Sequence, residues 1–136
     1  FDANTCDFSP GSASEPKSPS GRAAEIREEI VKAVRITNET LPMTIDEETR
    51  HDRTELGTGL RVINSYVLYN YLATEITAAD FREYIQQPVS SNACSTDSMK
   101  EFLRYGGIYV YVYKGNDDIE INRFEVSRKD CGYEAL

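Results

Sequence analysis

The sequence predicts an α+β domain in which helices pack on an antiparallel sheet. Three observations lead to this class: an amphipathic helical segment over residues 22–37, two short helices in the middle of the chain, and a hairpin near the C-terminus. Because helices and strands do not alternate as β-α-β units, an antiparallel sheet is expected. The 136 residues are expected to form one domain over 22–136, preceded by an arm over 1–21.

The first 21 residues are rich in Ser, Pro and Gly and have almost no apolar periodicity. Such a composition is typical of a linker or a disordered arm. It could serve as a tether to an anchor or could be an unstructured leftover. The helix that follows carries an apolar stripe at spacings of three and four, which predicts that it lies across one face of the sheet. The stripe consists of Ala23, Ile26, Ile30, Ala33 and Val34.

Two short helices are expected between the first strand and the hairpin. Thr77 and Asp80 have the spacing of a capping box, with Asp in place of the usual Glu, and Pro88 is expected to end the helix that they begin. The second helix is expected over 97–105, with Gly106 as its left-handed cap.

Strands are predicted where β-branched and aromatic residues gather. The segment 60–72 is one such strand. Residues 108–113 alternate strictly and are followed by a turn over 114–118 and a partner strand over 119–126, which together predict a β-hairpin. The return strand changes its apolar face near Asn122, which indicates a bulge.

The charge balance excludes several classes of function. The chain has 15 Lys+Arg and 23 Asp+Glu, a formal net charge of -8. This argues against nucleic-acid binding and against adsorption to anionic lipid. No apolar stretch reaches the ~18 residues of a membrane span, so no transmembrane segment is expected. With a single histidine and no Cys/His cluster, we expect no metal and no cofactor.

The three cysteines are Cys6, Cys94 and Cys131. Cys94 and Cys131 flank the last structured third of the chain, and we expect them to form a disulfide. Such a bridge is typical of a periplasmic or secreted protein. The alternative is three reduced thiols in a cytosolic protein. The role of Cys6 stays open, as does the oligomeric state.

The acidic segment 46–55 contains His51, the only histidine. A small hydrolase that uses His51 with a nearby carboxylate is the alternative function, but the interleaved Arg50 and Arg53 favour a solvated loop. Asn38, the Leu41-Pro42 pair, Asp46 and a following threonine are interpreted as a structural latch into the long strand.

Tyrosines are concentrated in the two strand regions. Alternation places one row of them on a single face of the hairpin strand, opposite Ile108, Val110 and Val112, which are expected to face the core. The row is interpreted either as cross-strand packing under a helix or as an exposed protein-binding face. The candidate binding residues are Tyr109, Tyr111, Tyr113, Tyr69 and Tyr71.

Through the Leu41-Pro42 and Asp46 span, the tyrosine-rich strand and the Cys94…Cys131 hairpin, residues 22–134 resemble small secreted or periplasmic bacterial α+β proteins. These include pilotins of type II secretion and proteins of the inhibitor or immunity type. A pilotin is expected to carry a lipidated N-terminal cysteine, from which Phe1 departs. The resemblance transfers no site residue.

We therefore expect a non-catalytic module of the bacterial periplasm or cell surface that binds another protein or peptide. The net charge of -8 favours a basic or amphipathic partner.

Overall fold

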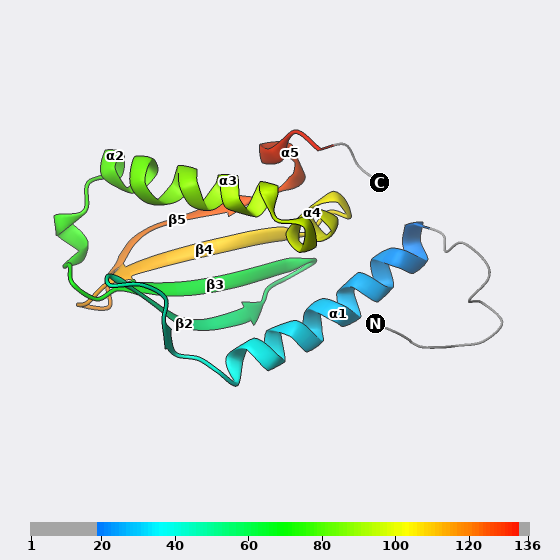
Figure 1. The fold of residues 1–136 in the computed structure, drawn as a ribbon, viewed down its shortest axis with the longest axis horizontal. Helices are drawn as coiled ribbons and strands as arrows, with labels where there is room; N and C mark the ends of the chain where they lie inside the picture. Colours follow the sequence, from blue (N-terminus) through cyan, green and yellow to red (C-terminus); the bar gives the residue numbers. More distant parts are fainter. Residues whose placement is uncertain (1–18, 134–136) are drawn as a thin grey trace.

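A five-stranded sheet with helices on one of its faces makes up the domain (Figure 1). The computed structural model describes residues 19–133, so the predicted arm up to residue 18 and Cys6 lie outside the described residues. The strands follow the order β1-β2-β3-β4-β5 across the sheet. They are β1 (Met43–Thr44), β2 (Thr49–Leu56), β3 (Arg61–Leu68), β4 (Ile108–Gly115) and β5 (Glu120–Val126).

The predicted α+β class is confirmed, and the sheet is antiparallel at three of its four strand pairs. The exception is the pair β3 and β4, which is parallel in the register Arg61↔Ile108 to Leu68↔Gly115. A parallel pair needs a long crossover connection. The two short helices predicted between these strands supply that connection, so their presence is the reason that the sheet is mixed.

Helix α1 (Pro19–Asn38) begins three residues before the predicted start at residue 22. It lies beside β2, and its N-terminal end approaches α4 (Figure 1). Ile26, on the predicted apolar stripe, is buried in the main core, while Ile30 and Val34 pack against that core from its edge. The predicted helix is therefore present, and only its first half contributes a fully buried side chain to the core of the domain.

The crossover contains η2 (Ala73–Glu75), α2 (Ala78–Phe81), the π-helical segment η3 (Arg82–Gln86), α3 (Gln87–Ser95) and α4 (Asp97–Arg104). The predicted cap is confirmed, because Thr77 accepts a hydrogen bond from the Asp80 amide at 3.0 Å. Gly106, with φ 96°, is the predicted left-handed residue.

The expectation that Pro88 ends the helix begun at Thr77 is wrong, because the chain stays helical to Ser95. Pro88 lies in the first turn of α3, directly after the π-helical turn of η3. A proline lacks the amide hydrogen and its ring crowds the carbonyl four residues back. The wider π turn is one way that a helix accommodates such an insertion.

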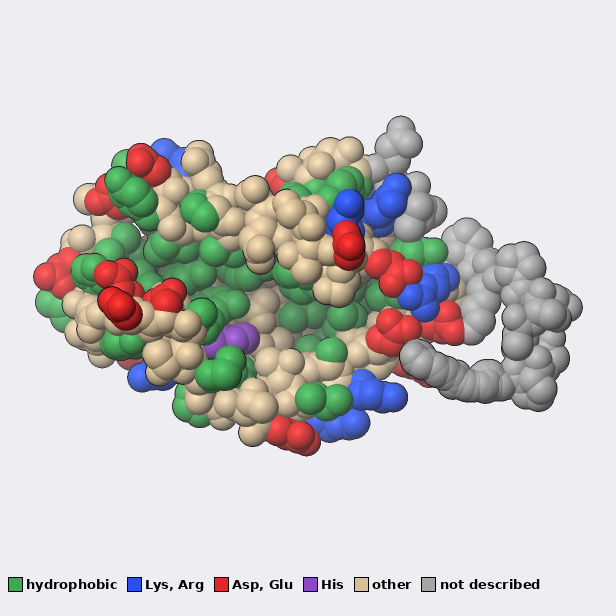
Figure 2. Space-filling view, in the orientation of Figure 1, with side chains coloured by type: hydrophobic (Ala, Val, Ile, Leu, Met, Phe, Trp, Pro, Cys, Tyr) green, Lys and Arg blue, Asp and Glu red, His purple; other side chains and the backbone are tan. Residues whose placement is uncertain are grey.

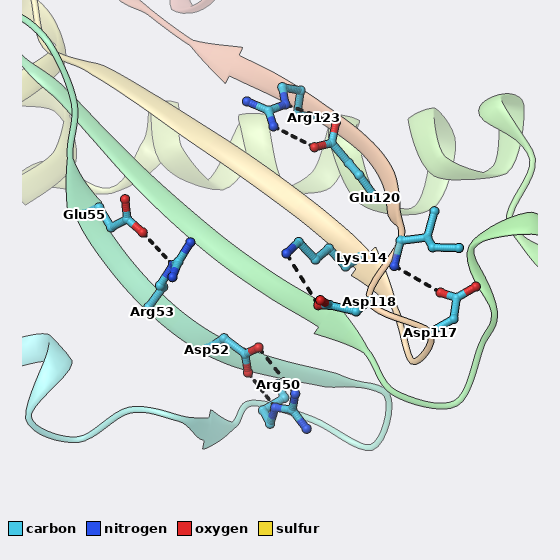
Figure 3. A network of polar contacts seen from close by, with 10 residues as sticks. Arg50, Asp52, Arg53, Glu55, Lys114, Asp117, Asp118, Glu120 and Arg123 are labelled. Carbon is cyan, nitrogen blue, oxygen red and sulfur yellow. Dashed lines mark hydrogen bonds and ion pairs between the residues drawn. The ribbon is translucent and has the colours of Figure 1, made fainter.

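Most of the acidic segment 46–55, expected to be a solvated loop, instead belongs to strand β2. Its charges lie in pairs along the strand: Arg50 contacts Asp52 at 2.5 Å and Arg53 contacts Glu55 at 2.5 Å (Figure 3). These pairs are partly exposed and keep one side of the strand in contact with solvent, while His51 and Thr54 are buried on the other side. Because the segment is rich in charged residues, its sequence lacks the apolar alternation that predicts a strand.

The hairpin β4–β5 is present as predicted. Its turn includes Asp118 with φ 65°, and Asp117 accepts a hydrogen bond from the Ile119 amide at 3.3 Å (Figure 3). The register shifts where Tyr113 pairs with Asn122 and Lys114 pairs with Glu120, which leaves Ile121 unpaired. This is the bulge predicted next to Asn122.

The face of β4 that meets the helices is the tyrosine face. Tyr109, Tyr111 and Tyr113 belong to the main core cluster with Phe81 and Phe124. The expectation that Ile108, Val110 and Val112 face that core is wrong. Because β4 is a central strand, both of its faces are buried, and alternation alone does not tell which face the helices cover.

Cys94, near the end of α3, and Cys131, in α5 (Arg128–Cys131), form a disulfide with their Cα atoms 5.4 Å apart. The Tyr133 hydroxyl donates a hydrogen bond to the Cys94 carbonyl next to the bridge. Lys100 lies over the Tyr133 ring at 5.7 Å. The bridge thus attaches the end of the chain to the helical crossover.

Candidate functional site

A groove of about 670 Å³ lies between α1 and the helical crossover, with the sheet as its floor. Figure 2 shows a hollow with a largely apolar lining between the two helical ridges. The strands β2, β3 and β4 supply the floor, and α1 and the segment from η3 to α3 supply the two walls. Its size lies within the range of ligand-binding pockets, ~300–1,000 Å³.

Each wall presents side chains at helical spacing. Ile30 and Val34 of α1 are four residues apart and line one wall, and Ile85 and Val89 line the other. Residues at this spacing lie on the same face of a helix. Met99 of α4 also lines the groove. Both walls therefore present aliphatic side chains to the groove, and these side chains are half-buried.

The floor is built from aromatic rings stacked across neighbouring strands. His51 of β2 lies opposite Tyr66 of β3 with ring centroids 4.5 Å apart, and Tyr66 lies opposite Tyr113 of β4 at 4.9 Å. The next ring is Phe124 of β5, 6.3 Å from Tyr113. Cross-strand aromatic pairs of this kind stabilise sheets. The row also gives the groove a flat, firm base.

The tyrosines of the floor are buried side chains. The exposed fractions are 9% for Tyr109, 4% for Tyr111 and 5% for Tyr113. Burial raises the pKa of Tyr66 and of Tyr109 to about 12. It also raises the pKa of Tyr111 and Tyr113, with the nearby hydroxyl of Tyr66 adding to the effect. All four phenols are therefore neutral at any physiological pH.

One end of the floor carries a small polar network around Thr54. The Thr54 hydroxyl donates a hydrogen bond to Asn64 Oδ1 at 2.9 Å. It lies 3.0 Å from His51 Nε2 and, having donated its own hydrogen, accepts a hydrogen bond from that nitrogen. Asn38 bonds both the amide and the carbonyl of Thr54, at 2.9 and 2.6 Å. Asp46 Oδ1 accepts from the Thr49 amide at 2.8 Å. These contacts hold β2 to the end of α1 and to the turn before β2, whereas the sequence predicts a latch at the entry to the strand over 60–72.

His51 does not have the partner that a hydrolase would need. Its ring is bonded to Thr54, and no carboxylate of residues 19–133 forms a hydrogen bond with it. The nearest acidic residue in the chain, Asp52, is bound by Arg50. Burial lowers the pKa of His51, with opposing contributions from Arg53 and Asp52. Within the same described range, no cluster of three potential metal ligands is found.

The lowered pKa of His51 gives a pH dependence of stability. The neutral form is favoured in the folded state, so its contribution is complete above the unfolded pKa near 6.5 and is lost as the pH falls toward the folded pKa. We expect the urea midpoint to fall when the pH is lowered from about 7 to about 5.5. His51 is the only histidine, so the variant His51→Gln should show a flatter profile. Equal profiles for both proteins would contradict this assignment.

Acidic side chains gather near both ends of the groove (Figure 2). At one end, Arg22 of α1 forms an ion pair with Glu101 of α4 at 2.6 Å and a second with Glu29 at 3.3 Å. This contact fixes α1 against the crossover. At the other end, Asp46 lines the groove.

The tyrosines singled out from the sequence fall into two groups. Tyr109, Tyr111 and Tyr113 line the groove, under the helices and not on an exposed outer face. Tyr69 and Tyr71 follow β3 and are not among the residues that line it. The Tyr69 hydroxyl donates to the Asp46 carbonyl at 2.7 Å, and the Tyr71 hydroxyl donates to Glu48 at 3.0 Å.

Sequence patterns do not reveal the walls or most of the polar end of the groove. The stripe through Ile30 and Val34 predicts core packing alone, although the exposed Ala33 on the same face belongs to the groove. His51 and Thr54 are the inward residues of a strand that the sequence does not predict. Because a bulge lies between His51 and Arg53, simple alternation does not identify them.

Comparison with solved structures shows which proteins share this fold. A Pseudomonas aeruginosa protein described as secreted superposes with a TM-score of 0.66 at 14% identity, over 81% of this chain and 96% of its own. The pilotin EpsS of the Vibrio vulnificus type 2 secretion system has a TM-score of 0.66 at 12% identity, over 82% and 96%. The type II secretion pilotin AspS of Vibrio cholerae has 0.61 at 16%, over 82% and 97%.

The resemblance to small secreted proteins and pilotins is thus confirmed at the level of the fold. No protein-family model matches the chain, and no curated protein matches it by sequence. Among the described helices, none is both long and apolar enough to cross a membrane.

Proposed function

We propose that this protein is a non-catalytic accessory of bacterial protein secretion that holds an amphipathic helix of a partner protein in its groove. The observation that carries the proposal is the groove itself. Two helices flank an aromatic floor of three strands, and the space between them is lined by apolar side chains of both walls. Helices pack side by side at about 8–10 Å between axes. A further helix is therefore the element that would complete this layer.

The geometry favours a helix over an extended peptide. An extended segment binds by adding a strand to the edge of a sheet. Here the open surface is a sheet face between two helical walls, where backbone groups of the strands are already paired. A helix satisfies its own backbone hydrogen bonds and needs only side-chain contacts, such as those that Ile30, Val34 and Val89 offer.

The charges indicate the flanks of the partner helix. The chain carries a net charge of -8, and Asp46 lies at one end of the groove. Basic residues that follow the apolar stripe of the partner helix would lie near acidic side chains at the ends of the groove, such as Asp46. Such complementarity mainly speeds association and fixes orientation. The partner we propose is thus amphipathic and basic at its ends.

The comparisons support a role in secretion, because two of the proteins with this fold are pilotins of type II secretion systems. The Cys94–Cys131 bridge supports a periplasmic or secreted location, since disulfides persist in oxidising compartments.

A peptide-display selection tests the groove and does not require that the natural partner be identified. The library consists of helix-forming peptides of about 18 residues, with a variable apolar stripe and basic ends. We expect binders whose affinity falls at least about tenfold in the variant Val34→Arg, because a charge is then placed in the apolar wall. Fluorescence anisotropy of labelled peptides measures the loss.

Val31→Arg is the matched control, since it introduces the same charge on the same helix at an exposed position outside the groove. It should bind as the unchanged protein does. Tyr84→Ala tests the opposite wall and alters a side chain that is 70% exposed, so folding is not at risk. Helical binders that are insensitive to both groove variants, or the absence of binders, would overturn the proposal.

A further inference from the structure

Four tyrosine hydroxyls on the groove floor have no protein partner among the described residues. Tyr66, Tyr109, Tyr111 and Tyr113 line the groove, and none of their hydroxyls forms a hydrogen bond with any residue of 19–133. The three tyrosines of β4 are nevertheless more than nine-tenths buried. Buried hydroxyls are normally bonded.

Three other tyrosines of the same protein, all less buried than those of β4, have hydrogen-bond partners for their hydroxyls. Tyr69 donates to the Asp46 carbonyl, Tyr71 to Glu48 and Tyr133 to the Cys94 carbonyl. All three lie outside the groove lining. The four floor tyrosines line the groove, so an occupant of the groove can reach their unpaired hydroxyls.

The floor tyrosines also lie close enough together to influence one another electrostatically. Tyr66 and Tyr109 both influence the ionisation of Tyr111, and Tyr66, Tyr111 and Asp46 influence that of Tyr113. A patch of neutral phenols at the base of an aliphatic groove is a donor and acceptor surface with no charge of its own.

We infer that the groove selects a helix whose inward face carries neutral hydrogen-bonding side chains, Ser, Thr, Asn or Gln, placed over the tyrosine floor. The inference rests on the proposed function. An entirely aliphatic face would strip water from the hydroxyls and leave them unpaired. A charged side chain would be buried without a counter-charge, because Asp46 lies at the end of the groove and already accepts two backbone hydrogen bonds.

The spacing of the floor indicates where these polar residues lie in the partner. The rings of Tyr109 and Tyr111 have centroids 6.4 Å apart along β4. Residues i and i+4 of a helix are separated by about 6 Å along its axis. The helical stretch from α2 to α3 runs along β5 and β4 (Figure 1), so a helix beside it follows the strand direction. Two polar residues four positions apart match two neighbouring tyrosines.

The same display library tests this inference when its inward positions are randomised between Leu and polar residues. Selection on the unchanged protein should enrich Ser, Thr, Asn or Gln at inward positions, with pairs at i and i+4. Selection on a Tyr66→Phe/Tyr111→Phe/Tyr113→Phe variant should enrich Leu at the same positions. Phe keeps the aromatic packing, so the floor keeps its shape.

A double-mutant cycle on one selected peptide gives the quantitative test. Tyr111→Phe should weaken the polar peptide by about tenfold and leave its Leu derivative unaffected or strengthened. Tyr69→Phe, which removes a hydroxyl outside the groove lining, should not discriminate between the two peptides. Groove-dependent binders with only apolar inward residues and no response to Tyr→Phe would overturn this inference alone. A complete lack of groove-dependent binders would overturn the proposed function as well.

Discussion

Loss of the Cys94–Cys131 disulfide is expected to lower the free energy of unfolding by about 4 kcal/mol. The bridge closes a loop with a sequence separation of 37 residues, and the chain-entropy account assigns its effect to the restricted unfolded state. Small domains are stable by only about 5–15 kcal/mol. Urea unfolding of the double variant Cys94→Ser/Cys131→Ser, compared with the oxidised protein, measures the change.

Both proteins should carry Cys6→Ser, so that no third thiol exchanges with the bridge. The reduced protein lacks the bridge as the double variant does, so the two should unfold at the same urea concentration. If oxidised and reduced forms had equal midpoints, the bridge would have no role in stability.

Phe81→Ala is expected to lower the free energy of unfolding by about 3–5 kcal/mol, because it removes a fully buried ring and leaves a cavity. Phe81 is 0% exposed and packs edge-on against Tyr113 at 5.5 Å and Phe124 at 5.8 Å. It thus holds the start of the helical crossover on the aromatic floor. Thermal or urea unfolding followed by circular dichroism measures the loss.

Tyr84→Ala serves as the control, since Tyr84 lies three residues later in the same helical stretch and is mostly exposed. Its effect on stability should stay within about 0.5 kcal/mol, as for other surface positions. An equally small effect of Phe81→Ala would show that the crossover is not anchored through this ring.

Features that depend on neighbouring residues in the chain were predictable. The Thr77 cap, the left-handed Gly106 and the β4–β5 hairpin each rest on hydrogen bonds or backbone angles within a few residues. Local chemistry decides such features, so composition and spacing are sufficient. The disulfide partners were also predictable, because two of three cysteines flank one structured segment.

Strand β2 and the continuous helix through Pro88 were not predictable in the same way. Their local preferences point to a loop and to a helix end. Pairing with β1 and β3 on either side keeps residues 49–56 extended, and the π turn of η3 keeps the helix continuous. In both places a contribution from beyond the local sequence exceeds a weak local preference.

The groove belongs to the tertiary structure. The sequence by itself determined the α+β class, the helices, the hairpin and a row of tyrosines on one side of β4. It could not determine that the helical crossover covers that side, because a central strand is apolar on both faces. Strand pairing brings His51, Tyr66 and Tyr111, which are distant in the chain, to one floor, and the packing of α1 and α3 beside that floor forms the groove.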